Sequence, residues 1–85
     1  MLLKVFSIRD GKAEYFGNPF FQVTHGEAER SFRTAVNDPK TTFSQFPEDF
    51  DMFYLGDFDN STGHFKALAT PQHVMKALQC VEKKD

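Results

Sequence analysis

Residues 46–65 read FPEDFDMFYLGDFDNSTGHF and contain five of the eleven phenylalanines in the chain. The same residues carry five acids and neither a lysine nor an arginine. Alternation of apolar and polar side chains predicts a β-strand over residues 50–58, a turn over residues 59–63 and a second strand over residues 64–69. The aromatic side chains of such a hairpin can stack on nucleic-acid bases, fill a core or join two subunits.

A second hairpin is predicted at the beginning of the chain. The first nine residues are rich in Leu, Val, Phe and Ile, and both faces of this strand are expected to be covered. Asp10-Gly11 favours a tight hairpin turn because such turns need positive φ at their central positions. A returning strand is therefore expected over residues 12–16, followed by a short apolar segment over residues 20–23.

One amphipathic helix is predicted after each hairpin. Residues 24–27, Thr-His-Gly-Glu, match a capping box, and Asn-Asp-Pro at residues 37–39 ends the helix that follows. Thr70-Pro71 supplies a cap and a first-turn proline for a closing helix that frays over residues 82–85. The apolar stripe of this closing helix consists of Val74, Met75, Leu78 and Val81.

The predicted order of elements is β-β-α-β-β-α. This order is typical of an α+β two-layer fold, in which an antiparallel sheet of about four strands carries two helices on one face. The first and last strands are expected to be neighbours in the centre of the sheet. A length of 85 residues predicts one domain, spanning residues 1–85.

Composition is that of a folded protein rather than a disordered one. Hydrophobic residues make up 40% and charged residues 26% of the chain. Cys80 is the only cysteine, so an internal disulfide is excluded. The first residues form neither a signal peptide nor a membrane span, which predicts a soluble protein of a reducing cytoplasm with no membrane partner.

Alternation in the third strand predicts which side chains face the helices and which face away. Phe50, Met52, Tyr54, Gly56 and Phe58 are expected to face the helices. The open face is then framed by Asp51, Asp57, His64 and Lys66. Its apolar centre predicts a protein interface, for a second copy or another protein, formed by Phe53, Leu55 and Leu68.

The charge distribution bears on nucleic-acid binding. The chain has a net charge of −2, but outside residues 46–65 it carries ten bases against seven acids. Proteins that bind single strands set Lys and Arg beside exposed rings, whereas an acidic total weighs against strong non-specific binding. The candidate phosphate contacts are Lys4, Arg9, Lys12, Arg30, Arg33, Lys40 and Lys66.

Motifs for catalysis or cofactors are weak. Residues 57–63 resemble part of a calcium loop, but the sixth-position glycine is missing and the twelfth position is Leu68. The three histidines do not have metal-ligand spacing, and the acids of residues 48–51 lie on a proline-containing loop where solvation is expected. The sequence therefore predicts a nonenzymatic protein with no metal, no cofactor and no catalytic residue.

Four segments together resemble the small nonstructural protein of gokushoviruses, the microvirus group of single-stranded DNA phages. They are MLLKVFSIRD, PFFQVTHGEAERSFRTAVNDPKT, PEDFDMFYLGDFDNSTG and TPQHVMKAL. The resemblance implies a location in the cytoplasm of the bacterial host. It also implies a role in DNA binding or in the switch to single-stranded genome synthesis and packaging, and it brings no catalytic motif.

Two functions stay open at this point. The first is engagement of single-stranded DNA, directly or as part of a complex, by a nonenzymatic phage protein that forms a homodimer or small homo-oligomer. The second is a protein-interaction module whose open sheet face binds a phage replication protein or a host protein.

Overall fold

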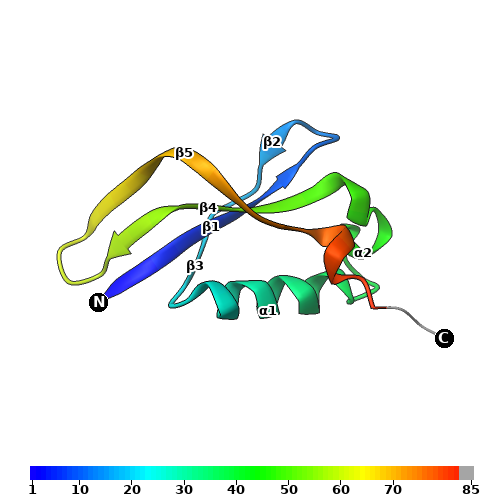
Figure 1. The fold of residues 1–85 in the computed structure, drawn as a ribbon, viewed down its shortest axis with the longest axis horizontal. Coiled ribbons are helices and arrows are strands. Elements are labelled where there is room, and N and C mark those ends of the chain that lie inside the picture. Colours follow the sequence, from blue (N-terminus) through cyan, green and yellow to red (C-terminus); the bar gives the residue numbers. More distant parts are fainter. Residues whose placement is uncertain (83–85) are drawn as a thin grey trace.

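Three long strands and one helix make up more than half of the structure, a computed structural model that describes residues 1–82 (Figure 1). Residues 83–85, the end of the predicted frayed segment, lie outside the described range. The elements in chain order are β1 (Leu2–Asp10), β2 (Tyr15–Phe16), β3 (Phe20–Gln22), α1 (His25–Val36), α2 (Thr42–Gln45), the 3-10 helix η1 (Pro47–Asp49), β4 (Phe50–Asp59), β5 (His64–Lys76) and the 3-10 helix η2 (Ala77–Cys80).

The sheet is antiparallel and has the order β2-β1-β4-β5, with β3 paired to the N-terminal half of β1. The predicted α+β class, with two α-helices and an antiparallel sheet, is confirmed. The prediction that the first and last strands are neighbours is wrong. The turn over residues 59–63 pairs β5 with one side of β4, and β1 pairs with the other side, so β1 and β4 are central.

The predicted closing helix is also wrong. Residues 70–76 continue strand β5, in which His73 pairs with Phe53 and Met75 with Met52. A short 3-10 helix, η2, follows in place of the expected helix. Pairing with β4 overrides the helical spacing of the apolar residues, and Leu78 and Val81 of the expected apolar stripe are exposed.

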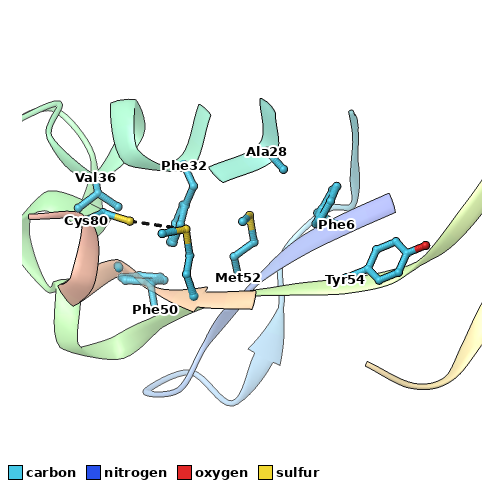
Figure 2. Close-up of a cluster of buried hydrophobic side chains, with 10 residues drawn as sticks. Phe6, Ala28, Phe32, Val36, Phe50, Met52, Tyr54 and Cys80 are labelled. Atoms are coloured by element: carbon cyan, nitrogen blue, oxygen red, sulfur yellow. Dashed lines mark hydrogen bonds between the residues drawn. The ribbon is translucent and has the colours of Figure 1, made fainter. Parts of the chain in front are cut away.

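The core lies between α1 and one face of the sheet (Figure 2). Ala28, Phe32 and Val36 lie on one side of α1 and are buried against the sheet. Phe6 and Met52, from the two central strands, are fully buried beneath them. Each large apolar side chain buried in this way stabilises the fold by about 1.5–3 kcal/mol, so this layer fixes α1 on the sheet.

Helix α1 begins and ends where the sequence predicts. The Thr24 hydroxyl accepts a hydrogen bond from the Glu27 amide at 3.1 Å, and the Glu27 carboxylate accepts one from the Val23 amide at 3.3 Å. Asn37 is the C-terminal cap. Its side-chain amide donates to the carbonyl oxygens of Arg33 and Cys80, at 2.8 and 2.9 Å, and so holds η2 against the end of α1.

Strand β4 contains a β-bulge that reverses its faces. Val5 pairs with Gly56 and Phe6 with Tyr54, so Leu55 has no partner on β1. Up to Tyr54 the predicted inward set is confirmed, since Phe50, Met52 and Tyr54 are buried in the core under α1. Beyond the bulge the prediction is wrong for Gly56 and Phe58, because the extra residue turns them to the side of the sheet away from α1.

The aromatic contacts agree with this reversal. Phe20 stacks on the core residue Phe6 at 5.9 Å between ring centroids, and its neighbour Phe21 must point to the opposite face. Phe21 contacts Phe58 at 5.6 Å. Phe58 therefore lies on the sheet face opposite α1, which we call the rear face.

Candidate nucleic-acid interface

Three phenylalanines form a contiguous group at the end of the rear face near the β4–β5 turn. Phe58 on β4 lies 5.2 Å from Phe65 on β5 and 5.6 Å from Phe21 on β3, measured between ring centroids. Phe21 and Phe65 are themselves 6.1 Å apart. Phe65 is 59% exposed and Phe21 is 43% exposed, so these rings present apolar faces to solvent instead of filling a core.

A second aromatic group lies further along the same face. The Phe53 ring has an edge contact with Phe16 of β2 and another with His73 of β5, both at 5.3 Å. The Nε2 atom of His73 lies 2.6 Å from a carboxylate oxygen of Asp51. Phe16 is 41% exposed, so this group also reaches the surface.

Basic side chains flank the second aromatic group. Arg9 pairs with Phe16 on one side and with Asp51 on the other, and Asp51 pairs in turn with Lys76. This cross-strand row places Arg9 and Lys76 on the rear face on either side of Asp51. Among the paired strand residues that the structure describes on this face, Asp51 is the only acid. Its carboxylate is in hydrogen-bond contact with the His73 ring.

Two of the sequence-predicted basic residues lie on the other face of the sheet. Lys4 and Lys66 pair with Asp57 from opposite sides, on β1 and β5 respectively. The Lys4 ammonium lies 5.3 Å from the centre of the Tyr54 ring, and the Tyr54 hydroxyl donates to the Asp57 carboxylate at 2.5 Å. Lys4 and Lys66 therefore lie beside an acid on the helix side of the sheet, away from the rear-face rings.

The Tyr54 hydroxyl makes a testable contribution to stability. Its hydrogen bond to Asp57, followed by burial and the Asp57 charge, raises the pKa of Tyr54 from 10.0 to about 12. Below pH 10 the hydroxyl is protonated in both the folded and the unfolded chain. Between about pH 10 and 12 the unfolded chain loses this proton while the folded chain keeps it. The contribution of Tyr54 to the free energy of unfolding therefore decreases as the pH rises through this range.

We expect Tyr54→Phe to cost about 1.5 kcal/mol at pH 7, because it removes a hydrogen bond to a charged acceptor. The free energy of unfolding of the variant should fall less steeply between pH 10 and 12 than that of the wild type. Urea denaturation across this pH range measures both effects. The control is Tyr15→Phe at an exposed position, and equal slopes for wild type and Tyr54→Phe would contradict the assignment.

The remaining predicted basic residues are dispersed. Arg30 and Arg33 are exposed on α1, on the other side of the sheet from the rear face. Lys12 lies in the turn after β1, where its amide donates to Asp10, and Lys40 lies in the loop after α1. Of the seven predicted basic positions, Arg9 is the one that the strand register sets beside the rear-face aromatic rings.

The three residues of the predicted protein interface lie in different settings. Phe53 is half-buried between Phe16 and His73 on the rear face. Leu55 is the unpaired residue of the β4 bulge. Leu68 is exposed and lies between Ala67 and Gln72, in the part of β5 for which no partner on β4 is found. Figure 1 shows β5 arching away from β4, on the side opposite α1.

Other titratable groups have local structural partners. The Ser61 amide donates to the Asp59 carboxylate at 2.8 Å, and this bond lowers the pKa of Asp59 within the turn. Cys80 is buried beside Met75, and burial raises the pKa of its thiol. Within residues 1–82, no three His, Cys, Asp or Glu side chains gather closely enough to hold a metal ion.

Sequence reasoning misses Lys76 and most of the rear-face rings. Apolar spacing assigns Lys76 to a helix, and uninterrupted alternation places Phe58 in the core. The sequence pattern assigns no face to Phe16 or Phe21. The signal that could have placed Phe58 is Gly56 in the middle of an apolar strand, because a glycine there is typical of a bulge or a close backbone approach.

The comparison with known proteins identifies the family. Residues 3–80 match the family model described as Phage ORF5 protein, so the chain belongs to this family. Protein ORF5 of Chlamydia phage 1 is 40% identical over 65 residues, which cover 71% of this chain and 67% of that protein. No solved structure matches.

These matches confirm the resemblance to the small nonstructural protein of gokushoviruses, and the chain is a phage protein. The helices in the part of the chain that the structure describes are all too short or too polar to cross a membrane.

Proposed function

We propose that this phage protein binds single-stranded DNA on the rear face of its sheet. It would act without catalysis, in the cytoplasm of the infected host, at the switch to single-stranded genome synthesis or packaging. The observation that carries this proposal is the group formed by Phe21, Phe58 and Phe65. Exposed rings on an antiparallel sheet are the usual platform on which single-stranded bases stack, and stacking contributes about 1–3 kcal/mol per base.

The charges of the rear face support the same proposal. Most acids of residues 46–65 do not face the rear-face rings. Asp57, for example, lies on the helix side of the sheet, and Asp59 caps the turn between β4 and β5. The rear face carries Arg9 and Lys76 at its second aromatic group, beside Phe16 and Phe53. Two cations give a weak electrostatic contribution, so we expect micromolar binding in which stacking supplies much of the affinity.

The experiment compares two pairs of neutralising substitutions. Arg9→Gln with Lys76→Gln should weaken binding of a labelled single-stranded oligonucleotide. It should also reduce the slope of log K against log salt by about 1.4, because two phosphate contacts are lost. Fluorescence anisotropy at several salt concentrations measures both quantities.

The matched control is Arg30→Gln with Arg33→Gln, which changes the net charge equally but on the exposed side of α1. This pair should leave the slope close to that of the wild type. A larger effect from the α1 pair than from the rear-face pair would move the DNA contact to the helix and contradict the proposal.

A second candidate function is a protein-interaction module. The observation that favours it is the exposure of every residue of β5 from His64 to His73, at one edge of the sheet. Strand edges and apolar patches of this kind also bind a second copy or another protein. Self-association without any DNA binding at low salt would favour this candidate.

A further inference from the structure

An open groove of about 1060 Å³ lies on the helix side of the sheet, away from the rear face. Its walls are α1, the segment of α2 and η1, and the turn that joins β1 to β2. Six of its lining side chains are aromatic, namely Tyr15, Phe20, Phe32, Phe43, Phe46 and Phe50. A groove of this size is slightly larger than the usual range for small-molecule sites, about 300–1,000 Å³.

The aromatic rings at the floor of the groove pack against one another, and the rings at its mouth are exposed. Phe43 has edge contacts with Phe32 at 5.8 Å and with Phe50 at 4.8 Å, so the deep rings hold one another in place. At the mouth, Phe46 is 50% exposed and Tyr15 is 63% exposed. Both rings are therefore accessible to an apolar side chain that enters from solvent.

Acids predominate at the rim. Asp10, Glu48 and Asp49 line the groove together with one base, Lys12. The rim is also held in shape, because the Gly11 amide donates to the Asp49 carbonyl oxygen at 2.7 Å and joins the β1–β2 turn to η1. The salt bridges found within residues 1–82 involve other acids, so none of these three carboxylates is neutralised by a cation. One oxygen of Asp10 accepts from the Lys12 and Ala13 amides, and the carboxylates of Glu48 and Asp49 can pair with a cationic partner.

We propose that this groove binds a peptide segment of another protein, in which bulky apolar side chains are flanked by Lys or Arg. The apolar side chains would insert between Phe46 and Tyr15, and the cations would pair with the acidic rim. DNA is a poor occupant because three carboxylates would face its phosphates. The groove and the rear face would therefore allow the protein to bind a basic protein and single-stranded DNA at the same time.

The test is a selection from a random peptide library on the immobilised full-length protein, followed by anisotropy measurements on the selected peptides. We expect the selected peptides to be enriched in Lys or Arg next to Phe, Leu or Trp. Phe46→Ser should weaken binding of such a peptide about tenfold, as truncation of an aromatic anchor does. Glu48→Lys should weaken it about fivefold.

The matched control is Phe65→Ser, because Phe65 is 59% exposed, close to the 50% of Phe46, but lies on the rear face. It should leave peptide binding unchanged. Circular dichroism establishes that each variant is folded. Selection of acidic peptides, failure to select any, or equal binding to wild type and Phe46→Ser would overturn the proposal, and none of these results depends on whether the rear face binds DNA.

Discussion

Replacing Gly56 by alanine should reduce the free energy of unfolding by about 3 kcal/mol or more. Gly56 has a φ of 148°, which side chains rarely adopt, and a Cβ atom there would lie 2.3 Å from the Lys66 carbonyl oxygen and 2.9 Å from the Ala67 Cα atom. Both atoms belong to the backbone of β5, so no side-chain rotation relieves the clash. Urea denaturation followed by far-UV circular dichroism measures the loss.

Two other glycines provide controls for this substitution. Gly26 lies in α1, where a Cβ atom would have only the Thr24 hydroxyl nearby, at 3.9 Å, so Gly26→Ala should be neutral or gain up to about 1 kcal/mol. Gly63 has a φ of 79° but open space around it, so Gly63→Ala should cost about 1 kcal/mol. If Gly56→Ala were as stable as Gly26→Ala, the close approach of β5 to the bulge would be wrong.

The double substitution Phe21→Ser with Phe65→Ser should weaken binding of single-stranded DNA about a hundredfold. Each ring offers one stacking surface worth about 1–3 kcal/mol, and loss of both corresponds to that factor. The two rings are exposed and lie outside the buried core, so the variant should remain folded. Anisotropy titrations with a labelled oligonucleotide measure the change in Kd.

Phe46→Ser is the control for the loss of an exposed phenylalanine. It removes a ring of similar exposure from the groove on the helix side, and its DNA affinity should equal that of the wild type. Retention of full affinity by the Phe21/Phe65 variant would contradict stacking on the rear face. A comparable loss in Phe46→Ser would show that the effect does not depend on which face carries the ring.

Much of the fold could be predicted because local rules and tertiary contacts agree. The Thr24 cap, the apolar spacing of α1 and the stop at Asn37 specify the helix without reference to the sheet. Alternation of apolar and polar residues likewise assigns Phe50, Met52 and Tyr54 to the core, because β4 is regular up to Tyr54. In these segments, each residue favours locally the structure that it also has in the whole fold.

The errors arise where a tertiary contact overrides a local pattern. One unpaired residue, Leu55, reverses the side to which Phe58 points, and neither hydrophobicity nor spacing reveals a bulge of this kind. Residues 70–76 have helical spacing, but pairing with β4 holds them as a strand. Both errors affect the candidate site. They place Phe58 in the core and Lys76 in a helix, so that Arg9 is the one base beside the rear-face rings that the sequence predicted.

The most direct test of DNA binding on the rear face is a fluorescence anisotropy titration of the wild-type protein. A labelled single-stranded oligonucleotide and the duplex of the same sequence should be compared at low and at physiological salt. Because stacking needs unpaired bases, we expect saturable, salt-sensitive, micromolar binding to the single strand and much weaker binding to the duplex. Absence of binding at low salt, or equal affinity for the duplex, would contradict the proposed function.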